Sequence, residues 1–352
     1  MAERKMATIR MIDSIDPIEG ADAIEVATVG GWKVVVKKGE FSPNDVAIFL
    51  EIDSWVPHEL APFLSKGKEP REYNGVKGEK LRTIRLKKQL SQGLLLPMSI
   101  FGCGSGYDEP VDLRPDYKVG DDVSEVLGIQ KWEAPINAQL AGVARGNFPS
   151  VVPKTDQERC QNLKKELQTW IEKGYTWEVT EKLDGSSCTI YLDLDGEFHV
   201  CSRNLDLVRD ENNSFWKAAI NYNVEAVMRD NQLTGLAIQG ELIGEGIQGN
   251  PYGIKGHRFC VFDIYDTQIG AYLSRSARHN VANLCYLDSV PVLNRSVKLT
   301  ETESIDSLLK MAEGISVMGT TNTEREGLVF ACNEHPGLSF KAISNNFLLG
   351  QK

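Results

Sequence analysis

The sequence predicts an α+β protein in two parts, a small β-barrel followed by a domain of antiparallel sheets with flanking helices. With 352 residues, the chain is long enough for about two domains that each bury a core. The first hundred residues show short strand patterns separated by turn signals. Beyond residue 154, helical patterns alternate with strand patterns that pair mostly antiparallel, which is typical of α+β domains.

Residues 1–110 are predicted to form the barrel. The expected strands are 6–11, 23–29, 32–36 and 46–52, with 81–86 and 93–96 as a further pair. Five or six short antiparallel strands favour an OB fold, a barrel that often binds single strands or phosphates. Trp55 and Tyr73 are candidates for stacking on bases, although a lone aromatic ring in a barrel more often belongs to the core.

Charge is unevenly distributed along the chain. The net charge of −10 argues against a protein that binds nucleic acid over its whole surface. Residues 66–88 nevertheless hold nine basic and three acidic side chains, a local excess of 9 − 3 = 6 positive charges. A solvated face and an anion-binding surface are equally good interpretations of this basic stretch.

Residues 111–153 are predicted to be a linker with one short helix at 121–127, because glycine, proline and aspartate are frequent there. The second domain, 154–352, begins with a helix whose N-cap is expected at Thr155 and whose end is expected at Gly174. Further helices are expected at 213–230, 274–284 and 305–317, and strands at 236–242, 259–265, 327–331 and 338–343.

The stretch 177–204, WEVTEKLDGSSCTIYLDLDGEFHVCSRN, is predicted to contain a hairpin around a primed two-residue turn at Asp195-Gly196. Before this hairpin, Lys182 and Asp184 lie at a bend between two strands. A lysine there is either an exposed long side chain or a covalent nucleophile.

Seven scattered cysteines without a CxxC pair argue against a disulfide framework or a zinc site and indicate a reducing compartment. No apolar run approaches the roughly 20 residues of a membrane span, and the N-terminus lacks the apolar core of a signal peptide. We therefore expect a soluble intracellular protein of the cytoplasm or nucleus, with no membrane partner.

The Lys-x-Asp-Gly motif at Lys182 is weak evidence alone, but other chemically useful residues lie at predicted strand ends. They supply an arginine, carboxylates, an aromatic ring and a second lysine, which are the groups that nucleotidyl transfer to lysine needs. These residues are Arg203 and Asn204 in SRN, Glu241 in GEL, Phe262 in FDIY, Glu326 in EGLVF, and Lys341 in FKAIS.

The ordered series EKLDGSS, SRN, GEL, FDIY, EGLVF and FKAIS resembles the six-element signature of covalent lysine nucleotidyltransferases, the superfamily of ATP-dependent ligases and capping enzymes. The preceding barrel, with EIDSWVPHELAPFL and QLSQGLLLP, is similar to that of family-5 RNA ligases. The resemblance covers nearly the whole chain. It implies that 154–352 is a nucleotidyltransferase (adenylyltransferase) domain.

By this resemblance, Lys182 attacks the α-phosphate of ATP and becomes lysyl-AMP. The AMP then passes to an RNA 5′-phosphate, and a 3′-hydroxyl displaces it. Asp184 and Lys341 join Lys182 as catalytic residues. The metal ligands, for Mg²⁺ or Mn²⁺, would be Asp184, Glu241 and Glu326. The nucleotide would be bound by Glu181, Lys182, Ser187, Arg203, Asn204, Glu241, Phe262, Glu326 and Lys341, with Phe262 stacking on adenine unless Phe259 does so.

This chain differs from many ligases at one position that would affect the positive charge around the phosphates of ATP. Many ligases have a second lysine two residues after the first in the last motif, where this chain has Ile343. Lys341 would then neutralise the α-phosphate alone or with help from a barrel residue such as Arg82 or Lys87. Only eleven residues follow Lys341, so we expect the barrel and its basic stretch to replace the C-terminal domain that orients pyrophosphate in other ligases.

The leading hypothesis is an ATP-dependent RNA ligase that seals 3′-OH/5′-phosphate breaks in RNA repair, acting as a monomer on nicked duplexes. A DNA ligase and a capping guanylyltransferase are the alternatives among enzymes. The alternative outside enzymes is a non-catalytic RNA-binding OB protein.

Overall fold

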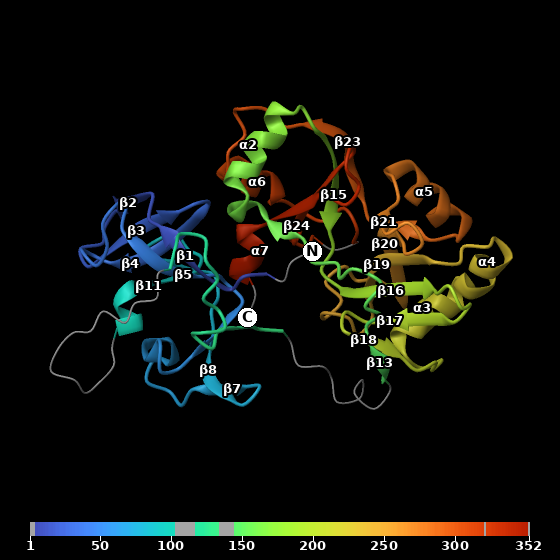
Figure 1. The fold of residues 1–352 in the computed structure, drawn as a ribbon, viewed down its shortest axis with the longest axis horizontal. Helices are drawn as coiled ribbons and strands as arrows, with labels where there is room; N and C mark the ends of the chain where they lie inside the picture. Colours follow the sequence, from blue (N-terminus) through green and yellow to red (C-terminus); the bar gives the residue numbers. More distant parts are fainter. Residues whose placement is uncertain (1–3, 103–116, 134–143, 320–321, 351–352) are drawn as a thin grey trace. The chain divides into compact units, whose positions relative to one another are not determined.

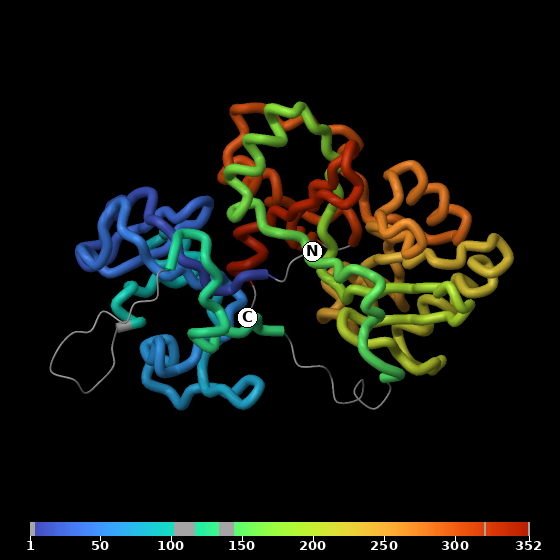
Figure 2. Tube along the Cα trace, in the orientation of Figure 1, coloured from blue at the N-terminus to red at the C-terminus, as the bar shows by residue number. Residues whose placement is uncertain are grey.

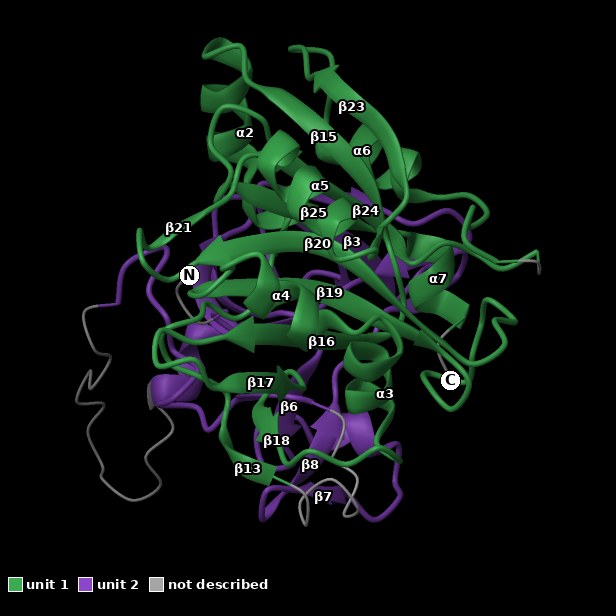
Figure 3. Ribbon diagram, turned by 90° about the vertical axis from the view of Figure 1, so that its right-hand side faces the viewer, with its two compact units in different colours: residues 1, 136–352 green, residues 2–135 purple. Residues whose placement is uncertain are grey.

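The structure, a computed structural model, describes residues 4–102, 117–133, 144–319 and 322–350. It contains two compact units, residues 2–135 and residues 136–352 together with residue 1 (Figure 3). In Figure 2, the first unit runs from blue to blue-green and the second continues from green to red. No described helix is long and apolar enough to cross a membrane.

The N-terminal unit is built of short strands. They form the sheets β1-β5-β11, β2-β3-β4, β12-β6-β8-β7 and β9-β10. The strands are β1 (Ala7–Met11), β2 (Ser14–Pro17), β3 (Ile24–Val29), β4 (Trp32–Lys37), β5 (Val46–Leu50), β6 (Ser54–Pro57), β7 (Arg71–Tyr73), β8 (Val76–Lys80), β9 (Ile84–Leu86), β10 (Gln89–Ser91), β11 (Leu94–Pro97) and β12 (Gln130–Lys131). Two 3₁₀ helices, Pro62–Ser65 and Met98–Gly102, complete the unit.

The core of this unit forms where alternate apolar residues of β1 and β5 point inward, among them Ile9, Ile48 and Leu50. Trp55 also belongs to the interior, at 2% exposure, and its indole N–H donates to the carbonyl of Val76. Its ring lies 5.4 Å from that of Tyr73. Trp55 is therefore a packing residue and not a stacking platform for bases.

Two predictions for this unit are wrong. Segments 81–86 and 93–96 do not pair, because β11 adds to β5 while β9 turns back directly onto β10. Residues 124–128 form turns and no helix, although the amide of Leu127 donates to the carbonyl of Val123. The side chain of Ser124 instead accepts hydrogen bonds from the amides of Met6 and Ala7, which ties the segment to β1.

The C-terminal unit contains two sheets. The larger has eight described strands in the order β13-β18-β17-β16-β19-β20-β21, with β22 added to β20. Helices α3 and α4 pack against it around a core that includes Phe198, Trp216 and Phe259 (Figure 1). The elements are β13 (Ala144–Asn147), β16 (Ser186–Leu192), β17 (Phe198–Cys201), β18 (Leu205–Leu207), α3 (Ser214–Asn221), α4 (Val224–Asp230), β19 (Leu236–Gly244), β20 (His257–Asp266), β21 (Ala271–Tyr272), α5 (Arg275–Leu284) and β22 (Asp288–Ser289).

The second sheet has five described strands in the order β14-β25-β24-β15-β23. Its core contains Trp177, Phe330 and Phe340, against which α2 and α6 pack. The elements are β14 (Glu158–Arg159), a 3₁₀ turn (Cys160–Asn162), α2 (Lys164–Glu172), β15 (Thr176–Lys182), β23 (Val292–Lys298), α6 (Ile305–Ala312), β24 (Gly327–Cys332), β25 (Ser339–Ile343) and α7 (Asn345–Gly350). The two antiparallel-rich sheets with flanking helices confirm the α+β prediction.

Helix boundaries differ from the prediction where the chain makes long-range pairs. Thr155 does not cap α2, which starts nine residues later, because Glu158 and Arg159 pair in parallel with β25. The expected helix 213–230 is two helices, since Asn223 has a left-handed conformation (φ +51°) that interrupts it. α6 ends at Ala312, two residues before Gly314, and not at 317.

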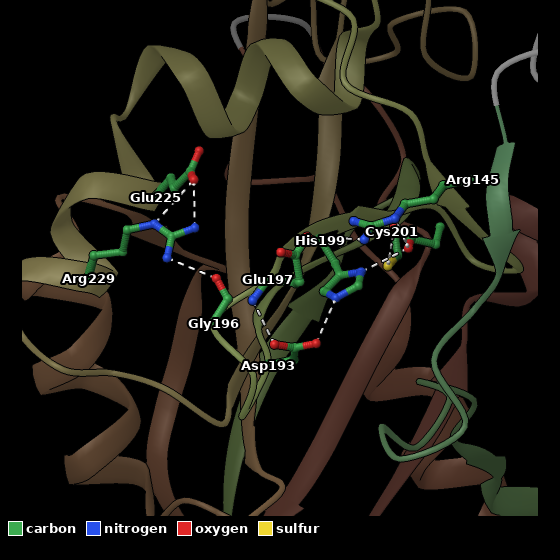
Figure 4. Close-up of polar contacts among 9 residues, drawn as sticks. Arg145, Asp193, Gly196, Glu197, His199, Cys201, Glu225 and Arg229 are labelled. Atoms are coloured by element: carbon green, nitrogen blue, oxygen red, sulfur yellow. Dashed lines mark hydrogen bonds and ion pairs between the residues drawn. The ribbon is translucent and has the colours of Figure 1, made fainter.

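The hairpin of β16 and β17 is present, but its turn is of another type. Gly196 is the one residue of Leu194-Asp195-Gly196 with positive φ (+84°), and the amide of Asp193 donates to the carbonyl of Glu197. This is a three-residue turn with glycine in the left-handed position, not a primed two-residue turn. Polar contacts hold it, including that from the Arg229 guanidinium to the Gly196 carbonyl (Figure 4).

Candidate active site

The candidate nucleophile lies where the chain passes from one sheet to the other. Lys182 is the last residue of β15 in the five-stranded sheet, and Ser186 is the first of β16 in the eight-stranded sheet. Gly185 makes this crossing possible: a Cβ there would lie 2.5 Å from the carbonyl oxygen of Leu242 and 2.7 Å from Cγ2 of Ile243. The Lys-x-Asp-Gly motif therefore places a lysine and a carboxylate at the edge between two sheets.

The ammonium of Lys182 pairs with one carboxylate, because its Nζ lies 2.7 Å from Oε1 of Glu326, and the carboxylates of Glu241 and Asp184 also act on it electrostatically. The side chain of Lys182 is 24% exposed. Burial by itself lowers the pKa of Lys182, but the carboxylates of Glu326, Glu241 and Asp184, in that order, outweigh burial and raise the pKa above its ordinary value. In this state the lysine is a protonated partner of the carboxylates and not a nucleophile.

With every group ionised, these side chains would carry excess negative charge, because three carboxylates face one ammonium. Burial raises the pKa of Asp184 to about 6, and the negative charge of Glu326 adds to the effect. Burial also raises the pKa of Glu241 to about 8, partly opposed by Lys182. A divalent cation near these oxygens would offset the excess, so the residues fit a metal requirement.

The three carboxylates are spread over both sheets. Asp184 follows β15, Glu241 lies on β19 opposite Ser187, and Glu326 immediately precedes β24. Among the described residues, no three histidine, cysteine or acidic side chains converge closely enough to enclose a metal ion directly. This spacing suits a cation that keeps its waters and contacts the carboxylates through them.

Glu181, one residue before the lysine, points elsewhere. It is 1% exposed, accepts a hydrogen bond from the hydroxyl of Ser316 and, at 3.0 Å, one from the amide of Val317. Its carboxylate thus holds the segment that follows α6. On β16, the hydroxyl of Ser187 lies 3.0 Å from that of Thr155.

Arg203 and Asn204, after β17, are held by a segment that the sequence pattern did not single out for the site. Arg203 Nη2 lies 2.6 Å from the carboxylate of Asp156, and Lys154 Nζ donates to the amide oxygen of Asn204 at 3.0 Å. With Thr155 beside Ser187, residues 154–156 contact two motif regions at once. The predicted helix cap at Thr155 concealed this role.

Phe262 is displaced from the regular pattern of β20 by a β-bulge. The pairing of β19 with β20 shifts between Gln239 and Gly240, whose partners are Asp263 and Val261. Phe262 is the extra residue, and it packs partly exposed beside Leu183 and Tyr252. Phe259, by contrast, is fully buried in the core beneath α3, so it is not available to a nucleotide in this structure.

Phe262 also borders a small cavity. The lining residues come from both sheets and from the segment before α2: Thr155, Gln157, Gln239, Phe262, Asp263, Tyr272, Gly337 and Ser339. The carboxylate of Asp263 pairs with Arg275 at 3.0 Å, and burial raises its pKa to about 6.

Lys341 has a basic neighbour that no sequence motif revealed. It lies on β25 directly opposite Arg159 of β14 in a parallel pair, a strand spacing of about 4.8 Å. Arg159 is 4% exposed, and Ile343, at 3%, is buried opposite Gly327. The structure thus brings a second cation beside Lys341 from a neighbouring strand.

Tyr252 is a further residue that sequence reasoning missed. Its hydroxyl accepts a 2.6 Å hydrogen bond from the amide of Asp184, and burial raises its pKa. It comes from the loop after β19, where only the glycine-rich sequence GEGIQGNPYG marked an irregular segment. Tyr252 fixes the backbone beside the candidate nucleophile.

Comparisons with known proteins identify relatives of both units of the chain. The RNA ligase family model matches residues 175–343, and the model of an OB-fold domain matches residues 6–98, which confirms the predicted OB fold. No curated protein sequence matches the chain.

Solved structures of variants of the RNA ligase of Naegleria gruberi are similar over almost their whole length. An apo variant is 42% identical with a TM-score of 0.87, covering 99% of this chain and 98% of that one. A variant with AMP and Mn is 42% identical with a TM-score of 0.88, and one with ATP and Mn is 41% identical with a TM-score of 0.86; each covers 99% of both chains. This chain belongs to the RNA ligase family.

Proposed function

We propose that the protein is an ATP-dependent RNA ligase that joins RNA 3′-OH and 5′-phosphate ends, with Lys182 as its nucleophile. The observation that carries the proposal is the placement of Lys182 at the crossing between two sheets, 2.7 Å from Glu326 and in the field of Asp184 and Glu241. Relatives solved with ATP or AMP and Mn support the choice of nucleotide and metal.

In the first step, the free amine of Lys182 forms a bond to the α-phosphorus of ATP while the bond to pyrophosphate breaks. The ammonium must first release its proton to solvent, because it has no free electron pair. A divalent cation, Mg²⁺ or Mn²⁺, supplies positive charge when bound near Asp184, Glu241 and Glu326. That charge cancels the attraction that now raises the pKa of Lys182, and so favours the free amine.

The remaining residues bind and orient the nucleotide. Lys341, assisted by Arg159 across the strand pair, neutralises the phosphate in place of the lysine that Ile343 replaces. Phe262 stacks on the adenine from the bulge of β20. Arg203, Asn204 and Ser187 contact ribose or phosphate from the strand ends, while Glu181 shapes the pocket by holding the segment after α6.

Two further steps complete sealing. The AMP passes from Lys182 to the 5′-phosphate of RNA, and the 3′-hydroxyl then attacks that phosphate and releases AMP. The substrate we propose is a nicked RNA duplex, sealed by a monomeric enzyme in RNA repair. The N-terminal OB-fold unit supports this substrate class, since such barrels bind nucleic acid strands and phosphates.

The test is the mass of the intact protein after incubation with ATP and Mn²⁺ or Mg²⁺. Wild type should gain one AMP, and Lys182→Ala should gain none. Nicked duplexes with RNA or DNA ends, together with α-labelled ATP or GTP, then identify the substrates. Labelling by GTP alone would indicate a capping-type enzyme, and unmodified wild type under both metals would indicate a non-catalytic RNA-binding protein.

A further inference from the structure

The hairpin β9–β10 of the N-terminal unit turns at two lysines in an unusual conformation. Lys87 and Lys88 have φ of +46° and +67°, and they connect Leu86 and Gln89, which pair across the hairpin. Positive φ at both central positions is the arrangement that asparagine and glycine provide at least cost. Two lysines are strained there, so a need for their side chains at the tip would explain their presence.

Seven of the nine basic residues in 66–88 fall into a neutralised and an unneutralised group, while Lys66 and Lys68, outside both groups, are exposed. On β7 and β8, basic side chains are paired: Arg71 with Glu79 at 2.6 Å, Lys77 with Glu69 at 3.0 Å, and Lys80 with Asp53 at 3.1 Å.

The hairpin shows the opposite. Arg82, Arg85, Lys87 and Lys88 are all exposed, and none of them forms an ion pair with another described residue. Four positive charges within seven residues, on the hairpin and just before it, are thus left to solvent. A bound polyanion would neutralise these four charges.

The base of the hairpin is fixed, while its outer strand is open. The amide of Val35 donates to the hydroxyl of Ser91, and the amide of Gln92 donates to the carbonyl of Lys33, which ties the end of β10 to β4. All three residues of β9 are exposed, including Ile84 at 47% and Leu86 at 38%. An apolar strip beside basic groups suits a ligand with phosphates and sugar or base faces.

We propose that the β9–β10 hairpin binds the sugar–phosphate backbone of the RNA substrate, with Lys87 and Lys88 each contacting a phosphate. This inference rests on the proposed RNA ligase function. The two-residue turn between Leu86 and Gln89 places the backbone of both lysines at the tip, so two charges are presented side by side. Ile84 and Leu86 contact sugar or base faces alongside.

The test exploits the turn itself. The double variant Lys87→Asn/Lys88→Gly removes both charges and installs the preferred residues for this turn, so its melting temperature should equal or exceed that of wild type. Its binding to a nicked RNA duplex, measured with the full-length protein, should be about tenfold weaker at 50 mM salt. The slope of log affinity against log salt should be shallower by roughly 1.5 to 2.

The matched control is Lys37→Gln/Lys38→Gln, which removes two exposed charges from the same unit at the end of β4. It should leave affinity and salt slope close to those of wild type. An equal loss of RNA affinity in both double variants would mean that any two positive charges of the unit contribute alike, and it would overturn the inference. Slower AMP transfer to Lys182 with unchanged RNA affinity would also overturn it, since the hairpin would then handle pyrophosphate.

A wrong inference about the hairpin can be distinguished from a wrong proposal about the ligase function. If wild type neither takes AMP from ATP nor seals RNA, the ligase proposal is wrong. If wild type seals RNA and Lys87→Asn/Lys88→Gly binds and seals it equally well, only the role of the hairpin is wrong.

Discussion

The ammonium of Lys182 lies 2.7 Å from Oε1 of Glu326, across the pair of strands β15 and β24. Gly327, the partner of Lys182 in this strand pair, also lets β24 lie close to β25, because a Cβ at that position would lie 2.3 Å from the carbonyl oxygen of Ala342. The ion pair favours the protonated form of Lys182, the candidate nucleophile, until a further positive charge binds nearby. The electrostatics of this cluster, more than its shape, therefore decide how the site responds to pH and metal.

Glu241→Gln should stabilise the metal-free protein at alkaline pH. The pKa of Glu241 in the folded protein is about 8, above its value of about 4.5 when exposed. The carboxyl group of Glu241 therefore makes its full contribution to the free energy of unfolding below about pH 4.5. This contribution is lost as the pH rises through about 8. Urea unfolding with chelator at pH 8.5 should show a gain of about 1–3 kcal/mol in the variant, an amount reduced because Glu241 is only partly buried.

At pH 5 the same substitution should change the unfolding free energy much less. Glu301→Gln, at an exposed position outside the site, is the matched control and should have no effect at either pH. A variant less stable than wild type at pH 8.5 would contradict the raised pKa.

Stabilisation by Mn²⁺ should grow with pH between about 5.5 and 8.5. The cation and protons compete for the same oxygens, and Asp184 and Glu241 have pKa values of about 6 and about 8. The shift in melting temperature on adding Mn²⁺ should therefore be larger at pH 8.5. In Glu241→Gln, the Mn²⁺-induced shift in melting temperature should still increase near pH 6 but should no longer increase above about pH 7. A shift in melting temperature that does not depend on pH would exclude these carboxylates as the metal site.

Gly185→Ala should reduce AMP transfer to Lys182 by at least about 100-fold, because displacing a reacting group by about 1 Å has an effect of that order. The added methyl would collide with the backbone of β19, so the chain must move beside the nucleophile. Adenylation by intact mass over time measures the loss.

Gly196→Ala is the matched glycine variant. Gly196 lies in the turn between β16 and β17, whereas Gly185 precedes the first residue of β16 (Figure 4). The φ of +84° at Gly196 predicts a stability loss of about 1 kcal/mol, yet an added Cβ would meet only Nη1 of Arg229, at 4.0 Å. It should adenylate normally. Equal losses of activity in the two variants would mean that general destabilisation, and not the crossing at Gly185, limits the reaction.

The sequence predicted the strands that carry the candidate site, because the alternation of apolar and polar residues and the residues typical of turns are signals that span only a few positions. Lys182 at the end of β15, Glu241 within β19 and Glu326 just before β24 are brought near one another, as the motif order implies. Segment 154–159 was misassigned, because its helix-like pattern is overridden by the parallel pairing of Arg159 with Lys341. Such a pair joins residues far apart in the chain, so no local signal records it.

Arg278 joins the two sheets of the C-terminal unit at the level of Phe262. From α5, its Nη2 lies 2.7 Å from the carboxylate of Glu178 on β15, and its Nη1 donates to the carbonyl of Phe262 at the bulge of β20. Both members of the ion pair are almost fully buried. Arg278→Met should therefore cost about 3–5 kcal/mol in urea unfolding, because it leaves a buried carboxylate without a partner.

The double variant Arg278→Met/Glu178→Leu separates stability from positioning. Replacing the whole buried pair with apolar side chains should recover most of the unfolding free energy. It should not restore the hydrogen bond to the carbonyl of Phe262, so the bulge that aims this ring stays unsupported. The KM for ATP in AMP transfer to Lys182 should then remain raised, by about tenfold, while the maximal rate changes less. A double variant with wild-type KM would show that Arg278 serves stability alone, whereas a raised KM with restored stability would mean that it holds Phe262 in position.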